Sequence, residues 1–598
     1  MQTRVDRVRE DAGHREIDSG CAVAFGPRMA AIPISRRPAS SAFSRLLLAV
    51  LGLLPPGVLV TVRASLDTPG RVFFEARLLY FTMPVVVGLA AIAAVWRWRA
   101  VPRSQRSAAH LWPGAVAAVV LTTIVFALVP PRMRVQFDET SLVSVSQNMH
   151  LQRAAVLATG AVPFDGGLVP IENMMDKRPP LFAFLVSLLH DVSGYRIANA
   201  FAVNAGLLAT ALLLVFAAAR RHLGLIGALA APFLLLAVPL TTLVATSAGF
   251  ELLAAVLFTL VLLSALDFVR QPDTVRFVGF LASGVLFAES RYESLPALGL
   301  VAVIVAWSVR RRFRPDRRAL VALAACPALV TPLVFLLLHS RNPNFYPEAG
   351  GQDLVSLQHG LEHAGPFLEA WFWPLFDNAL PGVLSVVAVF AYGTWLRRGR
   401  AGVADAVVVV PVLGVTIAVL CWFFSDVREP MALRLFLPLA WLTAQAPLLL
   451  PALFGRRVAA PLLAAAVVLC GVQLHAVHRG ARFPQLYVAQ LMDAIDAMLR
   501  DVPHDSRTLW VGMPAQYLIV KGNAALTAQS FMARGPDLED LFRRGRLKTV
   551  YVIQTPIDAT HAPAVGDVSA ILAMASGAEV VSRSAGGMPI VVHRLRLR

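Results

Sequence analysis

Long apolar segments separated by short polar stretches dominate the chain between residues 43 and 476. A membrane core about 30 Å thick is crossed by about 20 helical residues, and most of these segments approach that length. The pattern therefore predicts a bundle of thirteen transmembrane helices. They are expected at 43–63, 78–97, 111–130, 197–219, 223–243, 249–268, 277–290, 294–309, 319–338, 372–394, 405–424, 432–452 and 458–476.

The pattern changes beyond residue 477, where apolar and polar positions mix as in a globular protein. Residues 487–502 have the spacing of an amphipathic helix. Residues 508–513, 548–555 and 589–597 are short apolar runs bounded by turn residues, which is typical of strands. Because helices and strands alternate here, a small α/β domain is predicted over 477–598.

Composition supports a membrane protein. The chain has 598 residues, of which 57% are hydrophobic and 15% charged, and its mean hydropathy is +0.64. Soluble proteins carry about 25% charged residues, so a soluble protein is excluded. The net charge of +17 does not indicate nucleic-acid binding, because the basic residues gather in short groups between apolar segments.

This distribution of basic residues predicts the topology. Cytoplasmic loops are rich in Lys and Arg, and the first 42 residues are Arg-rich and polar without an apolar run, so residues 1–42 are expected to be a disordered cytoplasmic tail. An odd number of spans then places residues 477–598 on the outer face. The expected protein is a multi-pass protein of the plasma or inner membrane, with its transmembrane domain at 43–476.

Charged residues of both signs cluster in the loop after the third predicted span. Asp138 and Glu139 begin the stretch 138–167, whose apolar residues have near-helical spacing, and it is predicted to be an amphipathic helix lying along the membrane surface. Lys177 and Arg178 open the next apolar run, and Arg196 stands at the start of a predicted span. Carboxylates near a bilayer are costly unless they face water or a partner, so this acidic pair is a candidate for function.

The order of these features resembles the GT-C glycosyltransferases, in particular their family 39 and aminoarabinose-transferase-like branch. The resemblance rests on an apolar helix followed by Asp138-Glu139, a surface helix, the Lys-Arg-Pro-Pro-Leu turn at 177–181, then Arg196, and the late segment REPMALRLFLPLAWL at 428–442. It covers roughly residues 110–475. It implies a mainly α, GT-C-like bundle that transfers a sugar from a polyprenyl-phosphate donor to a lipid, glycan or protein acceptor on the outer face.

The chemistry of this reaction fits the residue types. Breaking a glycosyl-phosphate bond requires a base for the incoming hydroxyl and cations for the departing phosphate. Asp138 is the predicted base, with inversion at the sugar carbon, and Glu139 is expected to orient the acceptor or Asp138. The predicted substrate-binding residues are Lys177, Arg178, Arg196, Arg291, Glu293 and Arg434. Arg291 and Glu293 fit a structural ion pair in a helix hairpin equally well.

Other functions remain open. A transporter or lipid flippase, or an enzyme similar to O-antigen ligases and polymerases, would also be a polytopic membrane protein; however, transporters usually keep ionisable residues near the bilayer midplane. His359 and His363 match the H-x-x-E-H pattern of zinc peptidases, but the match is isolated. No cofactor is predicted with certainty, since an acidic pair can act as a base alone or hold a divalent ion.

Overall fold

A computed structural model describes residues 42–100, 110–135, 138–164, 167–340, 355–372, 380–398, 402–422, 430–479, 487–555, 568–574, 577–585 and 588–595. The chain divides into two compact units, Met1–Leu47 and Leu48–Arg598. Of the first unit, only the residues from Ala42 onward are described, as the beginning of a helix. Everything that follows concerns the second unit.

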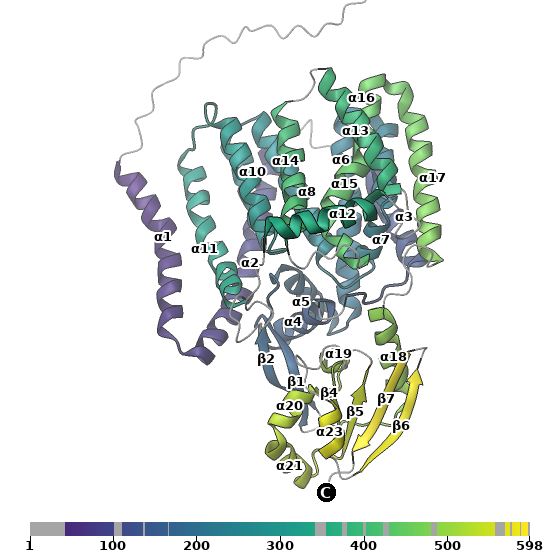
Figure 1. The fold of residues 1–598 in the computed structure, drawn as a ribbon. Helices are drawn as coiled ribbons and strands as arrows, with labels where there is room; N and C mark the ends of the chain where they lie inside the picture. Colours follow the sequence, from purple (N-terminus) through teal and green to yellow (C-terminus); the bar gives the residue numbers. More distant parts are fainter. Residues whose placement is uncertain are drawn as a thin grey trace, which may run out of the picture. The chain divides into compact units, whose positions relative to one another are not determined.

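Most of the second unit is a bundle of helices (Figure 1). It is formed by the part of α1 (Ala42–Ser65) from Leu48 onward and by α2 (Thr68–Ala100), α3 (Trp112–Leu128), α4 (Asp138–Gln152), α5 (Leu181–Ser193), α6 (Ala198–Leu236), α7 (Pro239–Ala245), α8 (Glu251–Arg270), α9 (Thr274–Ala288), α10 (Ser294–Val309), α11 (Arg317–Ser340), α12 (Leu357–Phe372), α13 (Leu380–Arg397), α14 (Val403–Leu420), the 3₁₀ helix η4 (Pro430–Phe436), α15 (Leu437–Gln445), α16 (Leu450–Phe454) and α17 (Ala459–His478).

Six stretches of helix among the described residues are long and apolar enough to cross a membrane. Helix α6 is one of them, and Gly224 interrupts it with a φ of 72°, which a residue with a side chain rarely adopts. The predicted polytopic fold is confirmed, whereas the count of thirteen spans stays a prediction because several apolar helices are shorter. The six stretches are Thr68–Ala100, Ala198–Leu236, Glu251–Arg270, Arg317–Ser340, Leu433–Phe454 and Arg456–His478.

The loop after α3 differs from the sequence-based expectation. Helix α4 ends at Gln152, and the chain continues as a hairpin of β1 (Val156–Phe164) and β2 (Gly167–Met175). Nearly all side chains of α4 between Glu139 and Met149 are buried, because α5, β1 and α19 pack against the helix. The prediction of one amphipathic helix that continues past Val156 along the membrane surface was therefore wrong.

The C-terminal region forms the predicted α/β structure. Its helices are α18 (Tyr487–Asp501), α19 (Ala515–Val520), α20 (Ala528–Ala533), α21 (Gly535–Arg543) and α23 (Val568–Met574). Its strands are β3 (Thr508–Val511), β4 (Ala524–Leu526), β5 (Thr549–Gln554), β6 (Ala578–Ala585) and β7 (Met588–Leu595). The central strands β4, β3 and β5 are parallel, and β7 and β6 continue the sheet antiparallel.

The hairpin of the membrane domain belongs to this same sheet. The strand order is β2-β1-β4-β3-β5-β7-β6, and β1 meets β4 through the antiparallel pair Ala161 and Ala525. The hydroxyl of Tyr195, between α5 and α6, donates to the carbonyl of Val520 at 2.7 Å. The segment from α4 to β2, which begins with Asp138, therefore lies between the helical bundle and the C-terminal domain.

Candidate functional site

Seven acidic and basic side chains alternate in one continuous chain of ion pairs. They come from the first residue of α4, the turn before α5, the first residue of α8, the turn after α9, and η4. Four of them are buried and the other three are partly buried, which is unusual for charged side chains and indicates mutual pairing. In order of contact they are Asp176, Arg178, Asp138, Arg434, Glu251, Arg291 and Glu293.

Both carboxylate oxygens of Asp138 are engaged. Arg178 donates through Nη2 to Oδ1, and Arg434 donates through Nη2 to Oδ2 at 2.5 Å. Arg178 also donates through Nη1 to Asp176 Oδ1 at 2.5 Å. The side chain of Asp138 keeps 24% of its surface exposed, against 7% for Arg178. Asp138 is therefore the most exposed of these four side chains.

Glu251 connects Arg434 to a second pair. Its Oε1 lies 3.0 Å from Arg434 Nε and 3.5 Å from Arg291 Nη1. Arg291 in turn forms a two-pronged pair with Glu293, through Nε at 3.0 Å and Nη2 at 2.9 Å. A Cβ added to Gly249 would collide with Glu251 Oε2, so the glycine makes room for this carboxylate.

The two acids that share Arg178 have pKa values shifted in opposite directions. Burial tends to raise the pKa of Asp138, but the charges of Arg178 and Arg434 outweigh it and hold this pKa well below the usual range. Burial raises the pKa of Asp176, and Arg178 only partly offsets that effect. Asp138 is thus charged, stable as an anion, and a weak base as long as both guanidinium groups remain on it.

Glu139 forms none of these ion pairs, and its hydrogen bonds go to the backbone instead. It is 1% exposed, and its Oε2 accepts from the backbone N–H groups of Arg134 at 3.0 Å and Ala248 at 3.2 Å. Burial raises the pKa of Glu139 to about 8 although Arg134 opposes the shift. Glu139 therefore ties the segments before α4 and α8 together, and no hydrogen bond joins it to Asp138 among the described residues.

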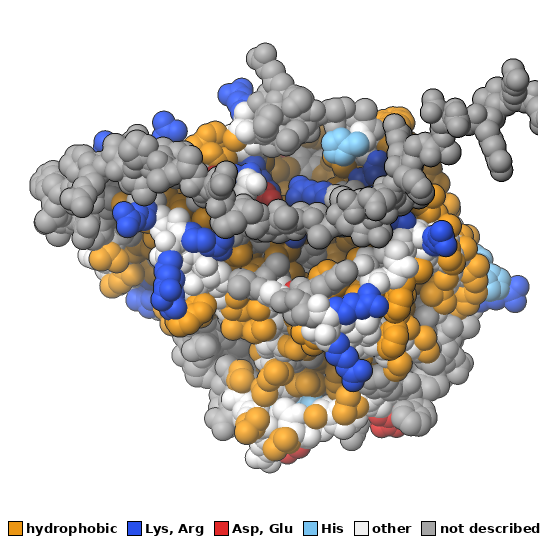
Figure 2. Space-filling model, turned by 90° about the horizontal axis from the view of Figure 1, so that it is seen from above, with side chains coloured by type: hydrophobic (Ala, Val, Ile, Leu, Met, Phe, Trp, Pro, Cys, Tyr) orange, Lys and Arg blue, Asp and Glu red, His pale blue; other side chains and the backbone are white. Residues whose placement is uncertain are grey.

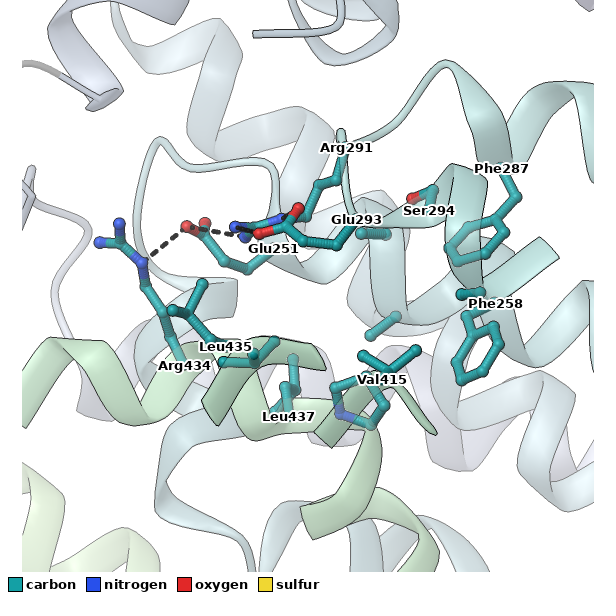
Figure 3. Close-up of a pocket in the computed structure, with 15 residues that line it drawn as sticks. Glu251, Phe258, Phe287, Arg291, Glu293, Ser294, Val415, Arg434, Leu435 and Leu437 are labelled. Atoms are coloured by element: carbon teal, nitrogen blue, oxygen red, sulfur yellow. Dashed lines mark hydrogen bonds and ion pairs between the residues drawn. The ribbon is translucent and has the colours of Figure 1, made fainter. Parts of the chain in front are cut away.

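A small cavity lies beside the ion pairs (Figure 3). Its polar end is formed by Glu251, Arg291, Glu293 and Arg434, and Figure 3 shows the dashed pairs of Glu251 with both arginines. Its other walls are apolar, and they include Phe258, Phe287, Val415, Leu435 and Leu437. The cavity therefore places two guanidinium groups, each paired with a carboxylate, at one end of an apolar space.

A larger apolar cavity, of about 610 Å³, continues along α8 toward its last turn. It shares Ala255, Phe258 and Pro438 with the small cavity. Side chains of α6, α8, α14 and α15 line it, and they are mostly aliphatic or aromatic. The two cavities together offer apolar space that leads away from Arg434.

The structure brings five of the eight predicted site residues together: Asp138, Arg178, Arg291, Glu293 and Arg434. Glu139 follows Asp138 in the sequence but accepts its hydrogen bonds from backbone N–H groups. Lys177 is half-buried in the turn beside Arg178. Arg196 is exposed, and its side chain forms no ion pair with any residue in the described ranges.

Candidate metal ligands do not gather in the described part of the chain, where no three His, Cys, Asp or Glu side chains are placed to hold an ion together. His359 and His363 lie on α12 with their rings 6.1 Å apart. His363 Nδ1 lies 2.9 Å from the carbonyl oxygen of Leu420, which occupies that nitrogen.

Two members of the site were missed by sequence reasoning. Glu251 is the first residue of an apolar helix, a position that favours an acid through the helix dipole and does not by itself indicate function. Asp176 directly precedes Lys177 and Arg178, and an acid beside two cations was the available signal. The Lys-Arg turn is therefore neutralised in part by its own neighbour.

Comparison with known proteins identifies the fold. No family model and no curated protein matches the chain. The structure of ArnT from Cupriavidus metallidurans bound to undecaprenyl phosphate matches with a TM-score of 0.50 at 16% identity, over 80% of this chain and 97% of that one. The apo form of ArnT from the same organism gives 0.49 at 17% identity, over 82% and 98%. The oligosaccharyltransferase AglB from Archaeoglobus fulgidus gives 0.43 at 13% identity, over 80% and 74%.

The likeness to ArnT extends over most of both chains. It confirms the predicted GT-C-type fold, a polytopic helical bundle followed by a smaller domain. At 16% identity it concerns the fold, and the chemistry must be argued from the residues of this chain.

Proposed function

We propose that this protein is a membrane glycosyltransferase that moves a sugar from a polyprenyl-phosphate donor to a hydroxyl of a lipid, glycan or protein. The reaction takes place on the outer face of the membrane, where the C-terminal domain also lies. The ArnT structure that shares the fold holds undecaprenyl phosphate, which makes a lipid phosphate the first ligand to test.

The position of Arg434 is the main support for this function. Its guanidinium group contacts Asp138 at 2.5 Å and also lines the cavity with apolar walls. A lipid phosphate whose chain lies in that cavity would meet Arg434 and Arg291 at its polar end. Arginine pairs with phosphate through two parallel hydrogen bonds, which favours it for this task. The larger cavity along α8 would accommodate the isoprenoid chain.

Arrival of the donor would also activate Asp138. With both oxygens paired, this carboxylate has a low pKa and little capacity to accept a proton. A phosphate that draws Arg434 or Arg178 away would free one oxygen and raise the pKa of Asp138. The acid would thus become a competent base only when the donor is bound.

The reaction then balances in one displacement. The acceptor hydroxyl gives its proton to Asp138, its oxygen bonds to the anomeric carbon, and the bond from that carbon to the phosphate oxygen breaks. The electron pair leaves with the polyprenyl phosphate, where the guanidinium groups stabilise the added charge. Attack from the opposite face inverts the configuration at the sugar carbon.

A reconstituted assay tests the proposal against transport. The purified full chain is placed in liposomes with a radiolabelled polyprenyl-phosphate sugar and a cell-envelope extract as acceptor. A transferase forms a labelled glycoside and releases polyprenyl phosphate, whereas a transporter or flippase moves the intact donor without forming a new bond. Mass spectrometry of envelope glycans from cells with and without the protein would identify the product.

Two variants sharpen the assay. Arg434→Gln should weaken binding of undecaprenyl phosphate and slow transfer, because it removes the group shared by the acid and the cavity. Arg311→Gln is the matched control, since Arg311 is exposed in the loop after α10 and lines neither cavity. Movement of intact donor without glycoside formation would contradict the proposal.

A further inference from the structure

A second cluster of charged side chains lies at the other end of α8. Glu251 begins this helix, and Asp267 lies in its last turn, about 24 Å further on at about 1.5 Å per residue. Three arginines from α2, α6 and α9 surround Asp267: Arg97 donates to its Oδ2, Arg221 lies 3.8 Å away and Arg276 lies 3.9 Å away. This cluster is therefore separate from the site around Asp138.

Positive charge exceeds negative charge in this cluster. Arg276 also pairs with Asp273, so three guanidinium groups share two carboxylates. Arg221 keeps 63% of its side-chain surface exposed. The face seen in Figure 2 carries many Lys and Arg side chains and few Asp or Glu side chains. An anion at Arg221 would relieve this excess of positive charge.

A cavity of about 370 Å³ opens beside the same arginines. Helices α2, α6, α8 and α9 line it, with Arg97 and Arg221 among its residues and with mostly small or aliphatic side chains elsewhere. Ala282 lies in its wall, and a Cβ added to Gly279 would lie 3.6 Å from Arg97 Cδ. Small residues on α9 thus leave apolar space directly next to a guanidinium.

We propose that this cavity binds an anionic phospholipid of the leaflet opposite to the sugar-transfer site. The headgroup phosphate would pair with Arg97 and Arg221, and an acyl chain would lie against α8 and α9. The excess of positive charge favours an anion, and the apolar lining favours a hydrocarbon chain attached to that anion. A phospholipid supplies both, whereas a free phosphate ion supplies only the charge.

Trp98 supports the placement at a membrane interface. It lines the cavity next to Arg97 and keeps 52% of its surface exposed. Tryptophan is enriched where the hydrocarbon core meets the headgroups, because its ring is apolar and its N–H is polar. The bound lipid would join α2, α6 and α9 around Asp267, so it would stabilise the bundle without entering the transfer reaction.

Thermal unfolding of the purified full chain in detergent provides the test. Dioleoylphosphatidylglycerol should raise the unfolding midpoint by a few degrees, because a ligand that binds only the folded state stabilises it. Dioleoylphosphatidylcholine and inorganic phosphate at the same concentration should not. Arg97→Gln combined with Arg221→Gln should raise the half-saturating concentration of the anionic lipid about tenfold or more, since charge-assisted hydrogen bonds are removed.

Two further variants separate this site from general attraction to a basic surface. Arg311→Gln combined with Arg314→Gln removes two exposed arginines of the loop after α10 and should leave the lipid effect unchanged. Ala282→Trp fills the cavity while keeping its arginines, and it should abolish the effect. Equal stabilisation by both lipids, a full effect of phosphate alone, or an undiminished effect in Ala282→Trp would overturn the proposal.

Discussion

Arg434 donates to Asp138 at 2.5 Å, although 296 residues separate the two along the chain. The contact joins the first turn of α4 to η4. Arg178 holds the other oxygen of Asp138 from only 40 residues away. Asp138 therefore lies between one partner that is near in the sequence and one that is distant. Removal of either partner would change the pKa and the position of the Asp138 carboxylate.

Asp138→Asn tests the acid as a base. The amide keeps the shape of the side chain but cannot accept the proton, so transfer should fall by about 10²–10⁴-fold. Asp176→Asn is the matched control, because Asp176 also pairs with Arg178 but has its pKa raised by burial. The measurement is turnover of a short-chain polyprenyl-phosphate sugar, with membrane expression checked. A similar decrease in both variants would mean that Asp138 only holds Arg178.

Replacing Lys177 and Arg178 with Gln tests the cationic turn. If these cations stabilise charge on the departing phosphate, turnover should drop by about tenfold or more for each cation removed, and by more than donor affinity does. Lys177→Gln alone is the cleaner variant, since Arg178→Gln also leaves Asp138 and Asp176 without their shared partner. Transfer at the wild-type rate in the double variant would reduce the turn to a headgroup anchor.

Gln516→Ala tests whether the C-terminal domain positions the acid. Gln516 of α19 accepts a hydrogen bond from Thr140 at 3.1 Å and bonds Ser141, so it holds the turn that follows Asp138. Removal of these neutral hydrogen bonds should slow turnover about 2- to 10-fold while binding of undecaprenyl phosphate stays constant. Arg543→Ala, at an exposed position of the same domain, is the control. Equal effects on turnover and binding would indicate a general disturbance of the structure.

The buried acid Glu139 predicts a pH dependence of stability. Burial raises its pKa from an ordinary value of 4.5 to about 8, so the folded protein holds the proton more tightly than the unfolded chain. The stabilisation is full below about pH 4.5 and is lost as the pH rises through about 8. Glu139→Gln should therefore flatten the fall in unfolding midpoint between about pH 5 and pH 9. A profile identical to that of the wild type would contradict the assignment.

The predicted topology can be tested by labelling. Gly535 lies at the start of α21, where an added Cβ would meet open space, so a cysteine is tolerated there. In a background without the native cysteines, Gly535→Cys should react with a membrane-impermeant reagent in intact cells, whereas Arg311→Cys should react only after lysis. The opposite result would reverse the predicted orientation.

The fold class was predictable because hydrophobic periodicity is a local property. In the C-terminal domain the same property located α18, β3, β5 and β7 within a few residues. It missed β4, which has only three residues, Ala-Ala-Leu, and no alternation. It also extended the helix at Asp138 too far, although Asp165-Gly166 in the sequence is a hairpin signal.

Only part of the site could be predicted from the sequence. Asp138 and Arg178 belong to one loop and were predicted as parts of one site, but their direct ion pair was not predicted. The connection through Glu251 depends on α8 crossing beside η4, which no local pattern contains. The partners of Glu139 were equally hard to predict, because two neighbouring residues of a helix point about 100° apart and only packing decides which groups each of them meets.

The strand pair of Ala161 and Ala525 can form only after the C-terminal domain has been synthesised. The ribosome completes the β1–β2 hairpin several hundred residues before it synthesises β4. One edge of β1 therefore stays unpaired while the intervening helices are inserted. Unpaired strand edges promote aggregation, and closing so long a loop is slow. A chain that ends before the C-terminal domain would therefore keep the edge of β1 unpaired permanently.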